Sequence, residues 1–266
     1  MKSVAVTAPG RVEIVEIESP TLGPYDSMVQ TEVSYICNAT DKKILDMHFP
    51  GLPKNAYPLL LGHESVGKIV ETGPKVTSFK PGDRVVSPLH LSPSEDRFGS
   101  ACGGHSEYTV VRDHAAMMAD GATRREDGWD KLFQIQLPVP DGIPTKTAAL
   151  LCTWREVYSA LFEDFGLTKE QEIIVFGAGP VGLSFVAFAK LAGFARVVSV
   201  DPVPSKRELA VLVGAHEAMD PGSTDLSTVD RAMTEALPDN ESGFDAVVDA
   251  VGSSSVINRA LSLVKH

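Results

Sequence analysis

Cysteine is scarce in this sequence, which has three cysteines among 266 residues, at positions 37, 102 and 152. Thiols so few and so far apart exclude a disulfide scaffold. In a reducing compartment such cysteines are more often metal ligands, nucleophiles or small core residues. The N-terminal residues also lack the apolar segment of a secretory signal. We therefore expect a cytoplasmic protein.

Basic residues and long apolar runs are scarce as well. The chain has 24 lysines and arginines against 35 aspartates and glutamates, a net charge of −11, so a basic surface for nucleic acid is not expected. The most apolar stretch, residues 173–200, is interrupted by Gly179-Pro180, Lys190 and Arg196, which argues against a membrane span. We therefore expect neither a nucleic-acid partner nor a membrane partner, and the length allows two globular domains.

One segment carries the clearest motif. The apolar, β-branched run 172–176 is typical of a buried parallel strand, and it leads into Gly177, Gly179 and Gly182, spaced G-x-G-x-x-G. An apolar helix candidate, a second apolar run and Asp201 follow, with the acid 19 residues beyond Gly182. This order predicts a dinucleotide site whose phosphates bind at the helix N-terminus. The alternative is a turn that binds nothing.

The choice of cofactor depends on Asp201. A carboxylate at this position accepts hydrogen bonds from both ribose hydroxyls and repels a 2′-phosphate, so we expect NAD rather than NADP. Lys206 and Arg207 could instead bind that phosphate, but we interpret them as the solvated face of a helix, from which Lys206 also reaches the ribose. The predicted cofactor-binding residues are Gly177, Gly179, Pro180, Val181, Gly182, Asp201 and Lys206.

Hydropathy patterns divide the chain into two domains, residues 1–150 and 151–266. Short strands separated by glycine- and proline-rich turns predict a partly closed antiparallel barrel or sandwich in the first. A helix over 147–165 leads into the second, where strands and helices alternate as in a doubly wound parallel sheet. The expected strands are 3–7, 12–17, 28–36, 65–71, 83–87 and 107–111, then 172–176, 196–200, 216–219 and 244–249. The expected helices of the second domain are 180–192, 204–213, 225–236 and 254–264.

Cys37, His63 and Cys152 are candidate zinc ligands. A catalytic zinc site needs three protein ligands and one open position, and the ligands can come from distant parts of the chain. Zinc would lower the pKa of an alcohol oxygen and so favour hydride transfer to a nicotinamide, which would join the two predicted sites in one mechanism. From the residues alone, the cysteines could also be buried core residues and His63 a hydrogen-bonded structural histidine.

Several segments match one family. They are YIC at 35–37, PLLLGHE at 58–64, FKPGDRV at 79–85, GGHSEY at 103–108, AALLC at 148–152 and GAGPVG at 177–182. On these motifs the chain resembles the zinc-dependent alcohol dehydrogenases of the medium-chain dehydrogenase/reductase superfamily. The resemblance implies α/β and β architecture, with a GroES-like, partly open β-barrel followed by a Rossmann domain. It also implies NAD-dependent interconversion of an alcohol or polyol and an aldehyde or ketone.

The resemblance also assigns roles to single residues. It makes Cys37, His63 and Cys152 the ligands of one catalytic zinc ion, with Glu64 behind the metal as a transient ligand. Many relatives hold a second, structural zinc with four closely spaced cysteines. In this chain only Cys102 lies in that region, so we expect no structural zinc and interpret Cys102 as a loop or core residue.

The residues after the first ligand depart from the family pattern. Relatives usually have Cys-x-Thr/Ser-Asp, whereas this chain has Cys-Asn-Ala-Thr-Asp at 37–41. We interpret the difference as an insertion of one residue. Thr40 is then the catalytic hydroxyl that hands on the alcohol proton, and Asp41 supports the ligands. Alternatively, Thr40 or Asp41 caps the helix that follows.

The sequence ends at His266, after the fourth strand and helix of the dinucleotide fold. A sheet of order 3-2-1-4-5-6 needs two more strands, so we expect an incomplete Rossmann domain, from a longer protein or a truncated product. Two alternatives to the dehydrogenase stay open. They are a zinc-free quinone or enoyl reductase of the same superfamily and an inactive dinucleotide-binding remnant. Full-length relatives are expected to be homo-oligomers.

Overall fold

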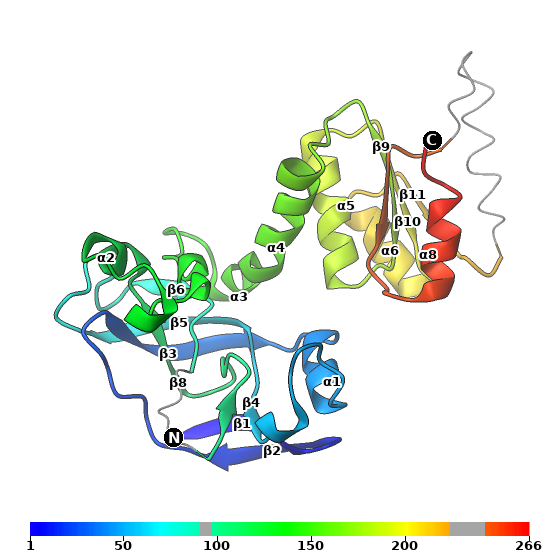
Figure 1. Cartoon of the computed structure of the whole chain (residues 1–266). Coiled ribbons are helices and arrows are strands. Elements are labelled where there is room, and N and C mark those ends of the chain that lie inside the picture. The colour runs from blue at the N-terminus through cyan, green and yellow to red at the C-terminus, as the bar shows by residue number, and fades with distance from the viewer. Residues whose placement is uncertain (91–96, 224–242, 266) are drawn as a thin grey trace. The chain divides into compact units, whose positions relative to one another are not determined.

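The computed structural model describes residues 1–90, 97–223 and 243–265. The chain forms two compact units, Met1–Cys152 and Thr153–His266 (Figure 1). The first consists of two sheets and short helices, and the second of a parallel sheet with helices. This is the predicted fold class. No helix among the described residues is both long and apolar enough to cross a bilayer.

Two four-stranded sheets form the first unit, with strand orders β2-β1-β4-β7 and β6-β5-β3-β8. The first hairpin forms as predicted, with β1 antiparallel to β2 and Ala8 paired with Arg11. Buried apolar residues such as Val29, Ile69 and Val111 form a core cluster of the second sheet. The strands are β1 (Lys2–Ala8), β2 (Arg11–Glu16), β3 (Asp26–Tyr35), β4 (Leu59–Leu60), β5 (Glu64–Thr72), β6 (Arg84–Val86), β7 (Gly99–Ser100) and β8 (Tyr108–Arg112).

Strand β3 organises the second sheet because it pairs antiparallel with both β5 and β8. Its register against β5 shifts twice, between Met28 and Val29 and between Thr31 and Val33. Such irregularities bend a strand and increase its twist. The same pairing places Tyr35 opposite Glu64, so the chain leaving β3 lies beside the chain entering β5.

The segment 112–136, for which the sequence predicted no strand or helix, contains a helix anchored by Asp113. The Asp113 carboxylate accepts the backbone N–H of Ala116 at 2.9 Å and those of Thr77 and Ser78 at 2.7 Å. Phe133 is buried further along this segment. The helical elements of the first unit are α1 (Thr40–Leu45), η1 (Lys54–Ala56), α2 (His114–Ala119), η2 (Arg125–Asp127), η3 (Lys131–Ile135) and α3 (Thr145–Ala149).

The second unit contains a parallel sheet of order β11-β10-β9-β12, which corresponds to the predicted order 3-2-1-4. Its strands are rich in β-branched residues because both faces of such a sheet are covered by helices. The strands are β9 (Glu172–Phe176), β10 (Arg196–Val200), β11 (Glu217–Met219) and β12 (Ala246–Asp249), and the helices are α5 (Pro180–Ala192), α6 (Pro204–Val213) and α8 (Ser254–Leu261). The helix expected at 225–236 lies outside the described residues.

The single helix expected over 147–165 is interrupted. Helix α3 ends at Ala149, α4 spans Leu151–Tyr158, and residues Ser159–Asp164 continue as a π-helix (η4). Along this segment the rings of Tyr158 and Phe162 lie with their centroids 4.9 Å apart. The apolar periodicity predicted helical structure correctly but could not distinguish α from π hydrogen bonding.

Candidate metal and dinucleotide sites

Three possible metal ligands come together at one end of the β3–β5 pair. The Cys37 sulfur, one imidazole nitrogen of His63 and one carboxylate oxygen of Glu64 all lie within 4.8 Å of one another. It is the one such group of histidine, cysteine and acidic side chains in the described part of the chain. Thiolate, imidazole and carboxylate are the ligand types that zinc takes in proteins, so these residues fit a zinc ion.

Local backbone geometry fixes His63 and Glu64. Gly62 has φ +105°, a conformation that favours glycine. A Cβ atom there would lie 2.4 Å from the backbone nitrogen of His105, so no larger residue fits without rearrangement. The glycine of the Gly-His-Glu motif thus lets the chain turn sharply and carry the histidine into the site.

Charges in the site act in opposite directions on the two proposed ligands Cys37 and His63. A hydrogen bond from His63 lowers the pKa of the Cys37 thiol, against the opposing effect of burial. Asp41, followed by Cys37, raises the pKa of His63 to about 10. Both shifts favour the charged forms of the pair, a thiolate at Cys37 and an imidazolium at His63. Zinc binding requires the neutral imidazole and must release that proton.

Asp41 lies at the centre of this arrangement. Its carboxylate Oδ2 accepts the backbone N–H of Cys37 at 2.9 Å, and Oδ1 lies 3.7 Å from His63 Nδ1. Burial alone would raise the pKa of Asp41, but contacts with His105 and His63 and the Cys37 N–H hold it well below its usual range. The capping alternative is wrong, because α1 has Ala39 as N-cap and no side-chain cap bond.

The third predicted ligand, Cys152, is not a member of this group. Cys152, the second residue of α4, is buried, and its sulfur lies 3.3 Å from Ser87 Oγ. It does not belong to the group in which all ligand atoms approach within 4.8 Å. Of the three ligands implied by the resemblance, Cys37 and His63 lie together in the structure, and Glu64, which the resemblance makes a transient ligand, lies with them.

A cavity of about 680 Å³ borders the candidate metal site. His63 and Thr40 contribute to its wall, and its apolar lining includes Phe49, Leu52 and Leu89. A mostly apolar cavity with a few polar groups at one side is the usual form of a small-molecule site. Cys102 also lines this cavity, and burial raises the pKa of its thiol.

The glycine turn of the second unit has the geometry that its motif predicts. Gly177 has φ +93°, and Gly179 is the N-cap of α5, with Pro180 as the first helical residue and Val181 after it. A Cβ atom on Gly182 would lie 1.8 Å from the Gly177 carbonyl oxygen. Glycine at this third position is therefore required by the fold of the turn itself.

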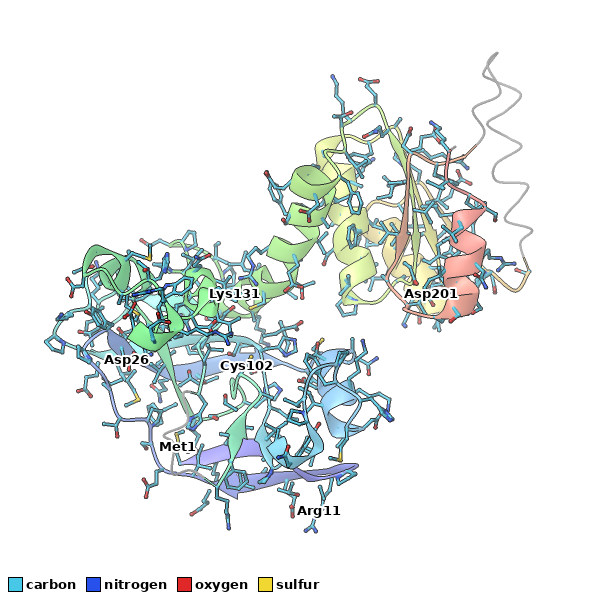
Figure 2. All side chains as sticks on the ribbon, in the orientation of Figure 1. Met1, Arg11, Asp26, Cys102, Lys131 and Asp201 are labelled. Atoms are coloured by element: carbon cyan, nitrogen blue, oxygen red, sulfur yellow. The ribbon has the colours of Figure 1, made fainter. Side chains whose placement is uncertain are left out.

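Asp201, labelled in Figure 2, follows β10 and is buried. Its Oδ2 accepts the backbone N–H of Ala178 at 2.8 Å, and Oδ1 accepts that of Val203 at 2.9 Å. Lys206 Nζ lies 3.9 Å from Oδ2, and Arg207 donates to the Asp201 carbonyl at 2.7 Å. The sequence predicted a ribose ligand. The structure shows, in addition, that this carboxylate ties the glycine turn to the end of β10.

His105 and Ser34 lie near the metal site, and the sequence predicted no role for either. His105 Nε2 lies 3.6 Å from Asp41 Oδ2, and His105 Nδ1 lies 2.6 Å from Ser34 Oγ. His105 was recognised only as part of the Gly-Gly-His-Ser-Glu-Tyr match. A histidine in a strand-to-turn segment carries no periodic signal of its contacts, so only the fold reveals them.

Comparison with known proteins agrees with this architecture. Residues 23–120 match the alcohol dehydrogenase GroES-like domain, and residues 180–266 match the zinc-binding dehydrogenase domain. Together the two matches cover most of the chain and both of its units. The chain belongs to the zinc-type alcohol dehydrogenase family of the medium-chain dehydrogenase/reductase superfamily.

Individual relatives are distant. The chain is 29% identical over its whole length to the NADP-dependent isopropanol dehydrogenase of Thermoanaerobacter brockii, of which it covers 73%. Its fold is similar to that of the alcohol dehydrogenase TADH from Thermus sp. ATN1, with a TM-score of 0.75 and 23% identity, covering 100% of this chain and 75% of that one. A quinone oxidoreductase of Pseudomonas syringae pv. Tomato DC3000 is similar too, with a TM-score of 0.75 and 22% identity, covering 99% and 70%.

Proposed function

We propose that the protein is a zinc-dependent dehydrogenase that transfers hydride between an alcohol and NAD. The observation that carries this proposal is the approach of Cys37, His63 and Glu64 within 4.8 Å beside a cavity lined by Thr40 and apolar side chains. Because that lining is largely apolar, it favours an alcohol with an apolar body over a polyol. The substrate remains within the class of small alcohols.

In this proposal each residue of the site has a separate task. Zinc bound at Cys37 and His63 would supply Lewis acidity toward an alcohol oxygen. Thr40, which lines the same cavity as His63, accepts the alcohol proton on its hydroxyl and passes it on. Leu89 and Phe49 hold the carbon chain and exclude water. The glycine turn of the second unit binds the pyrophosphate, because N–H groups at the start of α5 are free for an anion.

The third zinc ligand can be decided by substitution. The resemblance favours Cys152, whereas the distances favour Glu64. If Cys152 completes the site, Cys152→Ser should abolish stoichiometric zinc and Glu64→Gln should retain it. If Glu64 completes the site, the order is reversed. Zinc per chain, measured by plasma mass spectrometry on the purified protein, distinguishes the two arrangements, and Cys102→Ser serves as the matched cysteine control.

The proposed cofactor is NAD. Asp201 places negative charge where a 2′-phosphate would lie, although Lys206 reduces that effect from 3.9 Å. A relative is named for its dependence on NADP, so binding of both dinucleotides should be measured. We expect tighter binding of NAD, and we further propose a cytoplasmic protein whose full-length family members are homo-oligomers.

Two experiments test the function. The first is metal analysis of the purified protein, in which absence of stoichiometric zinc would favour the quinone or enoyl reductase suggested by the structural likeness to a quinone oxidoreductase. The second is NAD reduction across a panel of alcohols. Turnover that is lost in Cys37→Ala, and in whichever of the Cys152 and Glu64 variants also loses zinc, supports the dehydrogenase. Dinucleotide binding without turnover on any alcohol supports the inactive remnant.

A further inference from the structure

His105 is a largely buried histidine that the proposed chemistry does not use. Its side chain is 11% exposed and is held at several points. Nδ1 lies 2.6 Å from Ser34 Oγ, and its backbone N–H donates to the Leu61 carbonyl at 3.0 Å. A Cβ atom on Gly62 would lie 2.7 Å from the imidazole Cγ, so the ring packs directly on the residue that precedes His63.

The second ring nitrogen of His105 faces Asp41. Nε2 lies 3.6 Å from Asp41 Oδ2, while Asp41 Oδ1 lies 3.7 Å from Nδ1 of His63. Oδ2 also accepts the backbone N–H of Cys37 at 2.9 Å. The buried carboxylate is thus placed between two imidazoles and linked to the main chain of a proposed ligand. A rotation of Asp41 away from His105 would change its contacts with both Cys37 and His63.

We propose that His105 is a positioning residue of the metal site, which holds Asp41 in the orientation that aligns His63 and the loop carrying Cys37. This inference rests on the proposed metal site. Because Ser34 fixes Nδ1, the Nε2 side of the ring is directed at Asp41. Groups that orient metal ligands from outside the coordination shell typically change metal affinity by about 10- to 100-fold when they are removed. His105 should therefore control zinc affinity without contacting zinc.

The competing explanation is that the His105 ring only fills space above Gly62. Two substitutions separate the explanations because they retain opposite properties. His105→Phe keeps an aromatic ring and loses both nitrogens, whereas His105→Gln loses the ring and keeps an amide donor toward Asp41. A matched control, Ser106→Ala, removes the buried 2.7 Å bond to Ser3 in the same segment. It leaves His105 and Asp41 untouched.

The assay is competition for zinc between the purified protein and a chromophoric chelator, together with the visible spectrum of the cobalt-substituted protein. We expect His105→Phe to weaken zinc binding by about 10-fold or more and to alter the cobalt bands. His105→Gln should keep most of the affinity, and Ser106→Ala should match the wild type. If His105→Phe does not fold, Ser34→Ala replaces it, since a ring released at Nδ1 should also weaken zinc binding.

Two results would overturn the inference. One is wild-type zinc affinity and an unchanged cobalt spectrum in the folded His105→Phe or Ser34→Ala protein. The other is the reverse ranking, in which His105→Phe binds zinc normally and His105→Gln does not, as expected for a ring that only fills space. Failure of the wild-type chain to bind zinc is a separate outcome, which would remove the proposed function and this inference with it.

Discussion

Gly179 and Gly182, at the start of α5, differ in the space around them. Substitution of one should therefore affect folding, and substitution of the other should affect cofactor binding. A Cβ atom on Gly182 would lie 1.8 Å from the Gly177 carbonyl oxygen and 3.4 Å from Val175 Cγ1. A Cβ atom on Gly179 meets nothing within 4 Å, and its φ of −80° suits alanine. We predict that Gly182→Ala destabilises the second unit, whereas Gly179→Ala mainly weakens dinucleotide binding.

The magnitudes follow from these contacts. Carbon and oxygen atoms approach to about 3.3 Å, so a methyl group on Gly182 must displace a backbone carbonyl by more than about 1 Å. Overpacking of this kind costs about 1–3 kcal/mol, and we expect the upper end because the obstacle is backbone. At Gly179, alanine is a poorer N-cap than glycine, which costs about 0.5–1 kcal/mol of stability. Alanine also lowers the conformational entropy of the unfolded chain, which stabilises the folded state by a similar free energy. We expect a net change below about 0.5 kcal/mol.

The assay uses tryptophan fluorescence during urea unfolding. Trp154 packs edge-on against Phe188 of α5, with ring centroids 6.2 Å apart. A Trp129→Phe background leaves it as the only tryptophan, so the signal reports the second unit. Binding of NADH to the folded proteins is then titrated by fluorescence.

The expected outcome is a lower urea midpoint for Gly182→Ala and a wild-type midpoint for Gly179→Ala. We expect dinucleotide binding by Gly179→Ala to weaken by about 10-fold, because close backbone approach to the pyrophosphate requires glycine there. Equal midpoints for the two variants, or unchanged NADH binding by Gly179→Ala, would refute this reasoning.

Three further predictions concern single residues. In the metal-free protein, iodoacetamide should modify Cys37 faster than Cys102, because the pKa of the Cys37 thiol is lowered and that of the Cys102 thiol is raised. Mass spectrometry of tryptic peptides measures both modification rates. Added zinc should protect Cys37 from modification. Backbone N–H bonds lower the pKa of the Asp113 carboxyl against the opposing effect of burial. The stabilisation of the folded protein by the ionised carboxylate is therefore present above about pH 4. It is lost as the pH falls through the pKa that Asp113 has in the folded protein. Asp113→Asn should flatten this acid dependence of the urea midpoint. Ile174→Ala removes a fully buried side chain of β9 and should cost about 2–5 kcal/mol in urea unfolding.

Sequence patterns predicted the second unit more accurately than the first. Strands at 172–176 and 196–200 match the structure to the residue, because a parallel strand covered on both faces is a continuous apolar run between turn residues. The two-residue strands β4 and β7 are too short for any periodicity. Motifs likewise identified Cys37 and His63, which the structure brings together.

Contacts between buried polar groups were not predictable. The approach of His105 to Asp41 depends on how β3, β5 and the segment before β8 lie against one another, which no local pattern encodes. Similarly, no pattern predicted that the carboxylate oxygens of Asp201 accept N–H bonds from Ala178 and Val203. A buried carboxylate requires hydrogen-bond donors, and the nearest donors belong to whichever backbone the fold places there.

Asp201 is proposed to bind the ribose and also accepts the backbone N–H of Ala178. This second contact has a consequence for attempts to change the cofactor preference. Exchanging this acid for a small neutral residue is the obvious way to admit a phosphorylated ribose at the proposed site. The same exchange would leave the Ala178 amide without its acceptor and loosen the loop that is proposed to bind the pyrophosphate. Selectivity and loop order are therefore coupled through one side chain. An engineered switch would need a second change that restores an acceptor for that amide.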